Sequence, residues 1–233
     1  IILWILGMLV ICSIGAVVSK KHGVEYLIGM FAGSIVITAV IANKLVVFGP
    51  FTVSAAIIVF SVTFFLTDVI SEFWGKEYAK KAVWSGFLAN ILMLFAVWVA
   101  IQWTPASFWD GQEAFAKTLG VTGRIAVASV IAYVIAQSHD VWAYHFWKKK
   151  FKGKNLWLRN NLSTGVSQII DSFVFVTLAF YGTVPIMPII LGVTIVKLII
   201  AAIDTPFLYA VRWYFEKVKP YKKGKPVSLV TPI

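Results

Sequence analysis

Two carboxylates close an apolar run of membrane-spanning length. Asp68 and Glu72 stand one helical turn apart near the end of the run 53–73. An ionised side chain at bilayer depth costs about 2.5 to 3.5 kcal/mol even on lenient insertion scales, so such residues usually face a bundle interior or an aqueous path. No basic residue stands one turn from Asp68 within this run. The pair therefore predicts a polar site inside a bundle of membrane helices.

More polar side chains fall at compatible depths in the other apolar runs. Counting from the ends of the runs places Asp140 and Asp204 with Asp68 in the cytoplasmic half of the bilayer, and Asp171 and Lys197 near its midplane. These charged groups come from four runs, which indicates one solvated cavity, because scattered charges facing lipid would each be penalised. Three amides belong to the same set, namely Asn43, Asn90 and Gln168.

Several of these residues also have a purely structural explanation. Asp171 and Lys197 could neutralise each other, since they lie at similar depth on adjacent helices. Glu72 and Lys76 have i,i+4 spacing, and an exposed helix-end pair worth a few tenths of a kcal/mol is the favoured explanation for them. Asp140 precedes a basic run and could equally be a solvated charge at a helix end.

The composition places these residues in a polytopic membrane protein. The chain has 233 residues, of which 60% are hydrophobic and 13% charged, and its mean hydropathy of +0.85 lies far from that of a soluble domain. The single cysteine, Cys12, excludes an intrachain disulfide and a cysteine-based metal cluster. We expect an all-α integral membrane protein without a cofactor. Seven apolar runs can each cross about 30 Å of hydrocarbon as a helix: 1–18, 26–48, 53–73, 82–103, 125–146, 160–181 and 187–211.

The basic residues predict the orientation in the membrane. Of the 21 lysines and arginines, 17 fall after the first, third and fifth runs and in the C-terminal tail, which alternating helices place on one face. The positive-inside rule makes that face cytoplasmic, with the N-terminus outside and the C-terminus inside, in a multi-pass protein of the cell membrane. The net charge of +11 is therefore attributed to topology, and no nucleic-acid partner is expected.

A series of motifs runs through the apolar segments: Asn43-Lys44-Leu45, Thr67-Asp68, Phe73-x-Gly75-Lys76, Arg124-Ile125-Ala126, Gln137-x-x-Asp140, Ser163-Thr164-x-x-Ser167-x-x-x-Asp171-Ser172, and Lys197 with Pro206. In their order and spacing they resemble the queuosine-precursor transporters, also called vitamin uptake transporter-like proteins. The likeness covers about residues 26 to 215, or six helices, and no single motif carries it alone.

The resemblance implies import of 7-deazaguanine bases, such as the precursors of the tRNA nucleoside queuosine, or of the salvaged base queuine. A guanine-like edge has adjacent N–H donors that a carboxylate such as Asp68 or Asp171 can accept, and the three amides could read the carbonyl edge. A precursor that carries an aminomethyl cation would give a second acid a role. An aromatic ring could stack on the base, although each candidate ring is more often a packing residue: Phe64, Phe73, Phe173 and Tyr133.

The same resemblance gives a division of the chain. We expect an N-terminal transmembrane helix with its basic loop over 1–25, a six-helix transport domain over 26–215 and a basic cytoplasmic tail over 216–233. The spacing Gly29-x-x-x-Gly33 permits close helix contact and a possible homodimer. The external stretch 104–120 is favoured as an interfacial loop over a lid that lies on the membrane.

Two other classes of function can be weighed against this one. The substrate-binding subunit of an energy-coupling-factor vitamin importer has a similar six-helix body and small aromatic substrates, and the small residues of 29–33 could form its docking patch. An intramembrane hydrolase is disfavoured, because Gly-x-Gly-Asp, His-Glu-x-x-His and a serine nucleophile with a nearby catalytic histidine are missing. We therefore expect that the chain is not an enzyme.

Overall fold

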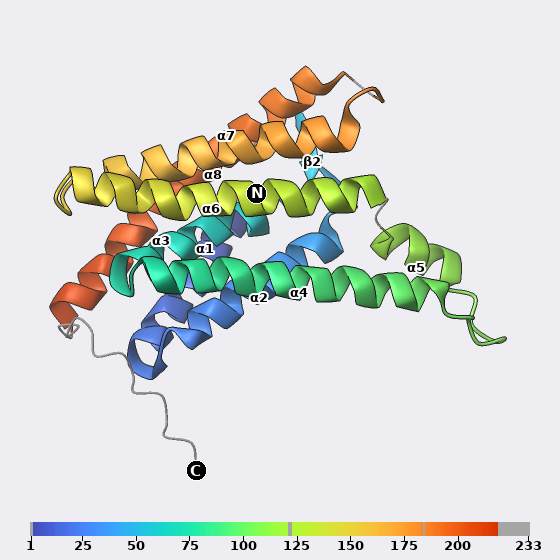
Figure 1. The fold of residues 1–233 in the computed structure, drawn as a ribbon, viewed down its shortest axis with the longest axis horizontal. Helices are drawn as coiled ribbons and strands as arrows, with labels where there is room; N and C mark the ends of the chain where they lie inside the picture. The colour runs from blue at the N-terminus through green and yellow to red at the C-terminus, as the bar shows by residue number, and fades with distance from the viewer. Residues whose placement is uncertain (1, 121–122, 184, 219–233) are drawn as a thin grey trace, which may run out of the picture.

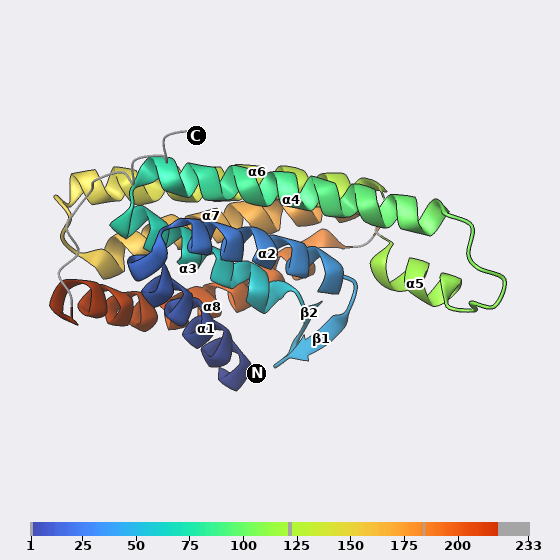
Figure 2. The ribbon, with the colours of Figure 1, turned by 90° about the horizontal axis from the view of Figure 1, so that it is seen from below.

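Seven long helices form a bundle in the computed structural model, which describes residues 2–120, 123–183 and 185–218 (Figure 1). Figure 2 shows α4 and α6 running alongside each other, with the short helix α5 at the end of the bundle away from the last turns of α8. One π-helical turn, η1 (Tyr214–Val218), follows the last helix. The helices are α1 Ile2–His22, α2 Glu25–Ile41, α3 Ile57–Phe73, α4 Lys76–Gln102, α5 Gln112–Leu119, α6 Gly123–Lys150, α7 Leu156–Phe180 and α8 Ile186–Trp213.

The helices carry the apolar surface of a membrane protein. Five stretches, containing α1, α4, α6, α7 and α8, are long and apolar enough to cross a membrane. α2 is a shorter apolar helix of 17 residues, and α3 has the same length. Large apolar side chains stand exposed on the outside of the bundle, including Leu88, Leu92 and Phe95 on α4. An all-α integral membrane protein is therefore confirmed, whereas seven full crossings remain a prediction.

The expected helices over 26–48 and 53–73 are wrong at the end of the first and at the start of the second. There the chain forms an antiparallel hairpin of two strands, β1 (Leu45–Phe48) and β2 (Phe51–Ser54). Together the two strands contain three valines, two phenylalanines and one threonine, residue types that favour the pleated surface of a sheet. Gly49 takes a φ of +58°, which the tight turn between the strands requires and which glycine adopts without steric cost. A short apolar run fits a strand as well as the end of a membrane helix, so the apolar pattern alone does not distinguish the two.

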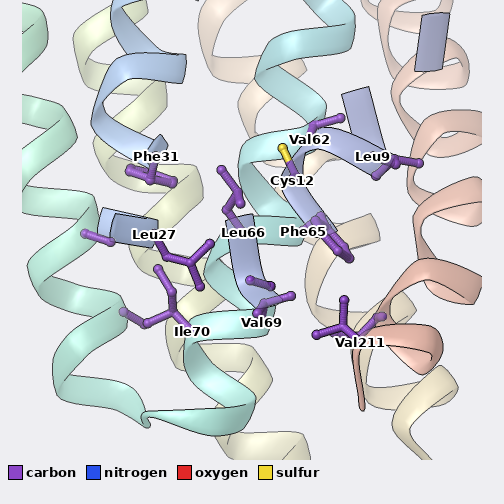
Figure 3. Close-up of a cluster of buried hydrophobic side chains, with 14 of the residues drawn as sticks. Leu9, Cys12, Leu27, Phe31, Val62, Phe65, Leu66, Val69, Ile70 and Val211 are labelled. Carbon is purple, nitrogen blue, oxygen red and sulfur yellow. The ribbon is translucent and has the colours of Figure 1, made fainter. Parts of the chain in front are cut away.

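α3 occupies the centre of the bundle. Every residue from 61 to 71 is buried. The apolar side chains of α3 gather with Leu9 and Cys12 of α1 and with Leu27 and Phe31 of α2 in one core, as Figure 3 shows. The polar side chains of the same helix meet α6 and α7. A helix buried on all sides is the one best placed to present polar groups to several neighbours at once.

Small residues have different roles on two helices. Ala132 and Ala136 are fully buried on α6, which packs most extensively against α7. Gly29 and Gly33 lie on an exposed face of α2, where an added Cβ atom would meet no atom within 4 Å. The glycine spacing is therefore not used for close contact within the described chain, and a homodimer through it stays a prediction.

Basic residues from distant parts of the chain meet at one end of the bundle, here called the basic end. The Lys20 amino group at the end of α1 donates a hydrogen bond of 3.2 Å to the backbone carbonyl of Tyr214 in η1. Lys148 at the end of α6 and Arg159 at the start of α7 both contact the carboxylate of Glu72. These contacts agree with the shared face predicted from the charges.

The predicted division at residues 25 and 215 stays a prediction. α1 packs against α2, α3 and α8, so the first helix is joined to the rest of the bundle by direct contact. Most of the predicted tail lies outside the described residues, which end at Val218. The lysines of the tail that fall there are Lys219, Lys222, Lys223 and Lys225.

Candidate functional site

A stripe of polar side chains runs along the inner face of α7. Asn160, Thr164, Gln168 and Asp171 follow one another at spacings of four, four and three residues, which place them on one side of a helix. All four are buried. Because α7 packs against α6 and α8 and touches α3, the stripe faces the acids that these helices carry.

Three aspartates from three helices meet this stripe, and they are here called the acid cluster: Asp68 on α3, Asp140 on α6 and Asp204 on α8. The Thr164 hydroxyl lies 2.9 Å from Asp68 Oδ2 and 3.4 Å from Asp140 Oδ1, so it links the two carboxylates. The Thr67 hydroxyl lies 3.3 Å from Asp140 Oδ2. Asp68 is also within electrostatic range of Asp204. The sequence prediction that these three acids share a site is thus consistent with their positions.

Several polar atoms of this region have no hydrogen-bond partner within the described chain. Asp204 accepts a 3.3 Å hydrogen bond from Asn160 Nδ2, but its other oxygen and Asn160 Oδ1 are unpartnered. Asp68 Oδ1 and both amide atoms of Gln168 are also unpartnered. A buried polar group without a partner costs roughly 1–3 kcal/mol. Such atoms are therefore the ones that gain most from contact with a polar ligand.

A separate ion pair lies farther from the basic end. Lys197 on α8 donates to the carboxylate of Asp171 on α7, and both side chains are buried. The Lys197 amino group also stands 5.0 Å above the centre of the Phe60 ring. These contacts match the structural explanation given above, in which the two charges neutralise each other. Gln168 lies one turn from Asp171 along α7, between this pair and the acid cluster.

Glu72 does not form the exposed pair with Lys76 that its spacing predicts. Its two oxygens each lie 2.7 Å from a guanidinium nitrogen of Arg159, and one of them lies 2.9 Å from the Lys148 amino group. The chain turns at Gly75, which has a φ of +94°, so α3 does not continue through residue 76. The i,i+4 relation of a continuous helix is therefore absent, and the partner comes from α7.

Two further sequence predictions are corrected by the structure. Asp140 is fully buried, so it is not a solvated charge at a helix end. Asn43 is exposed beyond the end of α2, and its amide nitrogen donates to the carbonyls of Thr118 and Gly120 at 2.8 and 3.1 Å. Asn43 thus holds the loop after α5 and lies away from the acid cluster.

The remaining candidates are dispersed. Asn90 is buried on α4, which packs on α2 and α6 rather than on α7 and α8. Phe64 lies one turn before Asp68 on α3 and packs edge-on against Phe60, with ring centres 5.7 Å apart. Tyr133 uses its hydroxyl to donate to the backbone carbonyl of Val83. Of the aromatic candidates named here, Phe64 is thus the one close to an acid of the cluster along its own helix.

Sequence reasoning missed three partners of the buried acids. Asn160 and Thr164 bind the acids directly, and Arg159 holds Glu72, yet none of the three was assigned a role. A signal was available, since polar residues at four-residue spacing inside an apolar run mark one face of a helix. The cleft of about 340 Å³ between α4 and α6 lies apart from all of them and is lined by Lys76 and Trp142 among others.

Comparison with known proteins gives the family. The family described as "Putative vitamin uptake transporter" matches residues 54–211, which is more than half of the chain. The chain belongs to this family. A "Probable queuosine precursor transporter" of Bacillus subtilis (strain 168) is 33% identical over 159 residues, which cover 66% of this chain and 69% of that one.

Two further relatives of this chain carry related names. A "Probable queuosine precursor transporter" of Haemophilus influenzae is 27% identical over 122 residues, and the "Queuosine precursor transporter" of Escherichia coli (strain K12) is 25% identical over 122 residues. In each case the match covers 52% of this chain and about half of the relative, 49% and 52% respectively. No solved structure matches the chain.

The family match takes in the whole acid cluster. It begins in β2 and ends within α8, so it includes Asp171 and Lys197 as well and leaves α1, α2 and Asn43 outside. The chain is therefore a multi-pass membrane protein of a transporter family. Among the described residues, no group of three or more His, Cys, Asp or Glu side chains could hold a metal ion.

Proposed function

We propose that this chain imports 7-deazaguanine bases, such as queuosine precursors, and binds them between the acid cluster and Gln168. The observation that carries the proposal is the set of buried, unpartnered polar atoms on α3, α7 and α8. The names of the three relatives support the substrate class. A transporter needs polar groups that bind the cargo and are released again when the cargo leaves. These atoms have no hydrogen-bond partner in the described chain, so they suit that role.

Each group has a role that its chemistry suits. Asp68 accepts an N–H of the guanine-like edge through Oδ1, the oxygen that Thr164 leaves without a partner. The Gln168 amide supplies one donor and one acceptor to the rest of that edge. Phe64, one turn from Asp68, is the candidate for stacking on the base. Asp171 keeps the Lys197 charge neutral beside the site.

The orientation of the chain in the membrane is assigned from the charges. We place the basic end in the cytoplasm and the N-terminus outside, because the positive-inside rule assigns the lysine- and arginine-rich face to the cytoplasm. The hairpin of β1 and β2 and the helix α5 then lie on the outer side. The acid cluster is closed off in this structure, since its three side chains are buried, so cargo enters and leaves when the helices around it move.

Binding is tested first on the purified, detergent-solubilised chain. Its thermal midpoint is measured with 7-deazaguanine bases, with guanine and adenine as controls. A rise with the 7-deazaguanines alone is expected, because binding to the folded state raises stability. Equal effects of guanine would reject selectivity for the deazapurine, and no effect of any base would reject the substrate class.

Transport is tested next in vesicles that contain only this chain. Asp68→Asn and Asp171→Asn are expected to abolish uptake of a labelled base while the protein stays membrane-inserted. Asp171→Asn should also lower the thermal midpoint, because it leaves the buried Lys197 without its counter-ion. Glu77→Gln is the control, since Glu77 is an exposed residue that pairs only with neighbouring Lys80 among its described ion pairs. Normal uptake by both aspartate variants would reject the site. Binding without uptake by the unmodified chain would instead favour the substrate-binding subunit of a coupled vitamin importer.

A further inference from the structure

A cleft on the outer side of the bundle lies apart from the acid cluster. It lies between α4 and α6, has a volume of about 340 Å³ and is here called the lysine cleft. Lys76, Lys80 and Trp84 of α4 line it together with Ser138 and Trp142 of α6. Sites for small molecules measure about 300–1,000 Å³, so the lysine cleft has room for a polar head group.

Positive charge gathers in the lysine cleft without an acid to balance it. No carboxylate lines the cleft among the described residues, and Lys76 forms no salt bridge with them although it is half-buried. Lys80 pairs with Glu77 at 3.2 Å, but both side chains are exposed, and such a pair contributes little. Lys80 can therefore exchange Glu77 for another anion.

The two lysines are placed to bind one anion together. Gly75 turns the chain with a φ of +94°, and α4 begins directly after it at Lys76. Lys76 and Lys80 are four residues apart, so they extend from the same side of the helix. Each ammonium group has three N–H donors and no acceptor, which suits the oxygens of a phosphate group.

The lysine cleft lies at the level expected for lipid head groups. Trp84 and Trp142 are 58% and 53% exposed, and tryptophan is enriched where a membrane meets water. Along α6, Trp142 precedes Lys148 of the basic end by six residues, which is roughly 9 Å along a helix. The cleft is thus within reach of the phosphate groups of the leaflet at the basic end.

Exposed apolar side chains continue from the cleft along both helices. On α4, Leu88 and Leu92 follow Trp84 at spacings of four residues, which keep them on the same side of the helix. On α6, Ile135 and Ile131 extend from Ser138 in the same direction, since the two helices are antiparallel neighbours (Figure 2). These side chains form an apolar surface on which acyl chains can lie below a head group held in the cleft.

We propose that the lysine cleft binds the head group of an anionic phospholipid, with its phosphate between Lys76 and Lys80. Basic pockets between membrane helices recognise lipid head groups through this combination of charge and neighbouring apolar surface. A soluble phosphate would use the two lysines and leave the exposed tryptophans and the apolar surface without a role. The lipid uses all three features.

The experiment compares two lipids with the same acyl chains. The purified full chain is mixed at neutral pH with dioleoyl-phosphatidylglycerol or dioleoyl-phosphatidylcholine in detergent, and bound lipid is counted by native mass spectrometry. The anionic lipid is expected to bind at least about tenfold more tightly, which corresponds to about 1.4 kcal/mol. Equal binding of the two lipids by the unmodified chain would overturn the proposal.

A matched pair of double variants locates the binding. Lys76→Gln with Lys80→Gln is expected to bring the ratio of the two affinities toward one. Lys81→Gln with Lys149→Gln is the control, because it removes the same charge from exposed lysines of α4 and α6 that do not line the cleft. An equal fall in both double variants would show a general attraction to basic residues and would overturn the site.

A competition arm distinguishes a lipid from a soluble phosphate. Glycerol 3-phosphate carries the same phosphate group without acyl chains, and it is expected to displace phosphatidylglycerol poorly. Displacement at concentrations similar to those of the lipid would overturn the assignment to a lipid. None of these measurements uses a nucleobase, so their outcome is independent of the proposed function.

Discussion

Replacing Glu72 by glutamine tests the ion network at the basic end. One carboxylate at the end of α3 is approached there by Arg159 of α7, Lys148 of α6 and Arg212 of α8. The Tyr144 hydroxyl donates a fourth contact of 3.0 Å. The substitution keeps the shape of the side chain and removes the charge that holds four helices together.

The cost is dominated by Arg159. Its side chain is 0% exposed and makes two hydrogen bonds of 2.7 Å to Glu72, so the variant leaves a buried guanidinium without its counter-ion. Lys148 and Arg212 are 27% and 30% exposed and can be solvated instead. Breaking a buried pair by removing one partner costs about 3–5 kcal/mol. For a chain of this length that is a drop of roughly 6–20 °C in the thermal midpoint.

The assay is thermal unfolding of the purified protein in detergent. Glu77→Gln is the matched control, because Glu77 is 76% exposed and an exposed i,i+3 pair is worth only about 0.2–0.5 kcal/mol. The double variant Glu72→Gln with Arg159→Gln should recover part of the loss, since it removes the buried charge as well. A midpoint for Glu72→Gln within a degree or two of the control would show that Glu72 does not hold Arg159.

Three other substitutions have definite expected results. Gly86→Ala should lower stability by about 1–3 kcal/mol, because an added Cβ would lie 2.6 Å from the Tyr133 hydroxyl; thermal unfolding measures this. Tyr133→Phe removes that hydroxyl and its bond to the buried Val83 carbonyl, at a cost of about 1–3 kcal/mol, and in combination with Gly86→Ala should relieve part of the clash. Asn43→Ala should change stability by less than about 1.5 kcal/mol and leave base affinity unaltered, because Asn43 is exposed and bonds only to loop carbonyls among its described hydrogen bonds; a large loss of affinity would place it at the site after all.

The position of a residue along its helix could be predicted from the sequence. Its side-chain partners could be predicted only in part. Asp171 and Lys197 were expected at similar depth on adjacent helices, and they do form a pair. Asp68, Asp140 and Asp204 were assigned to one half of the bilayer, and they lie in one cluster. Both results follow from the fixed rise of a helix, which turns a count of residues into a position along its axis.

The errors arose where a helix ends. The i,i+4 rule paired Glu72 with Lys76 on the assumption that one helix contains both, whereas Gly75 breaks it. Asn43 was placed inside a membrane helix that in fact stops at residue 41. An apolar run indicates hydrophobicity and says nothing about the hydrogen-bonding pattern of the backbone. The ends of the helices and the hairpin between α2 and α3 could therefore not be located from such runs.

Some buried charges along α7 have a counter-ion and others do not. This difference distinguishes residues that stabilise the fold from candidates for a binding role. Near the two ends of its polar stripe, Arg159 is neutralised by Glu72 and Asp171 by Lys197, as packing in a medium without water requires. Between them, the acid cluster has neutral donors and unpartnered oxygens. Stability alone would favour apolar residues or a matched cation at those positions, because both remove the cost of an unpaired buried charge. The chain meets that requirement on either side of the cluster and not within it, so the acid cluster is the part of the stripe that stability alone does not explain.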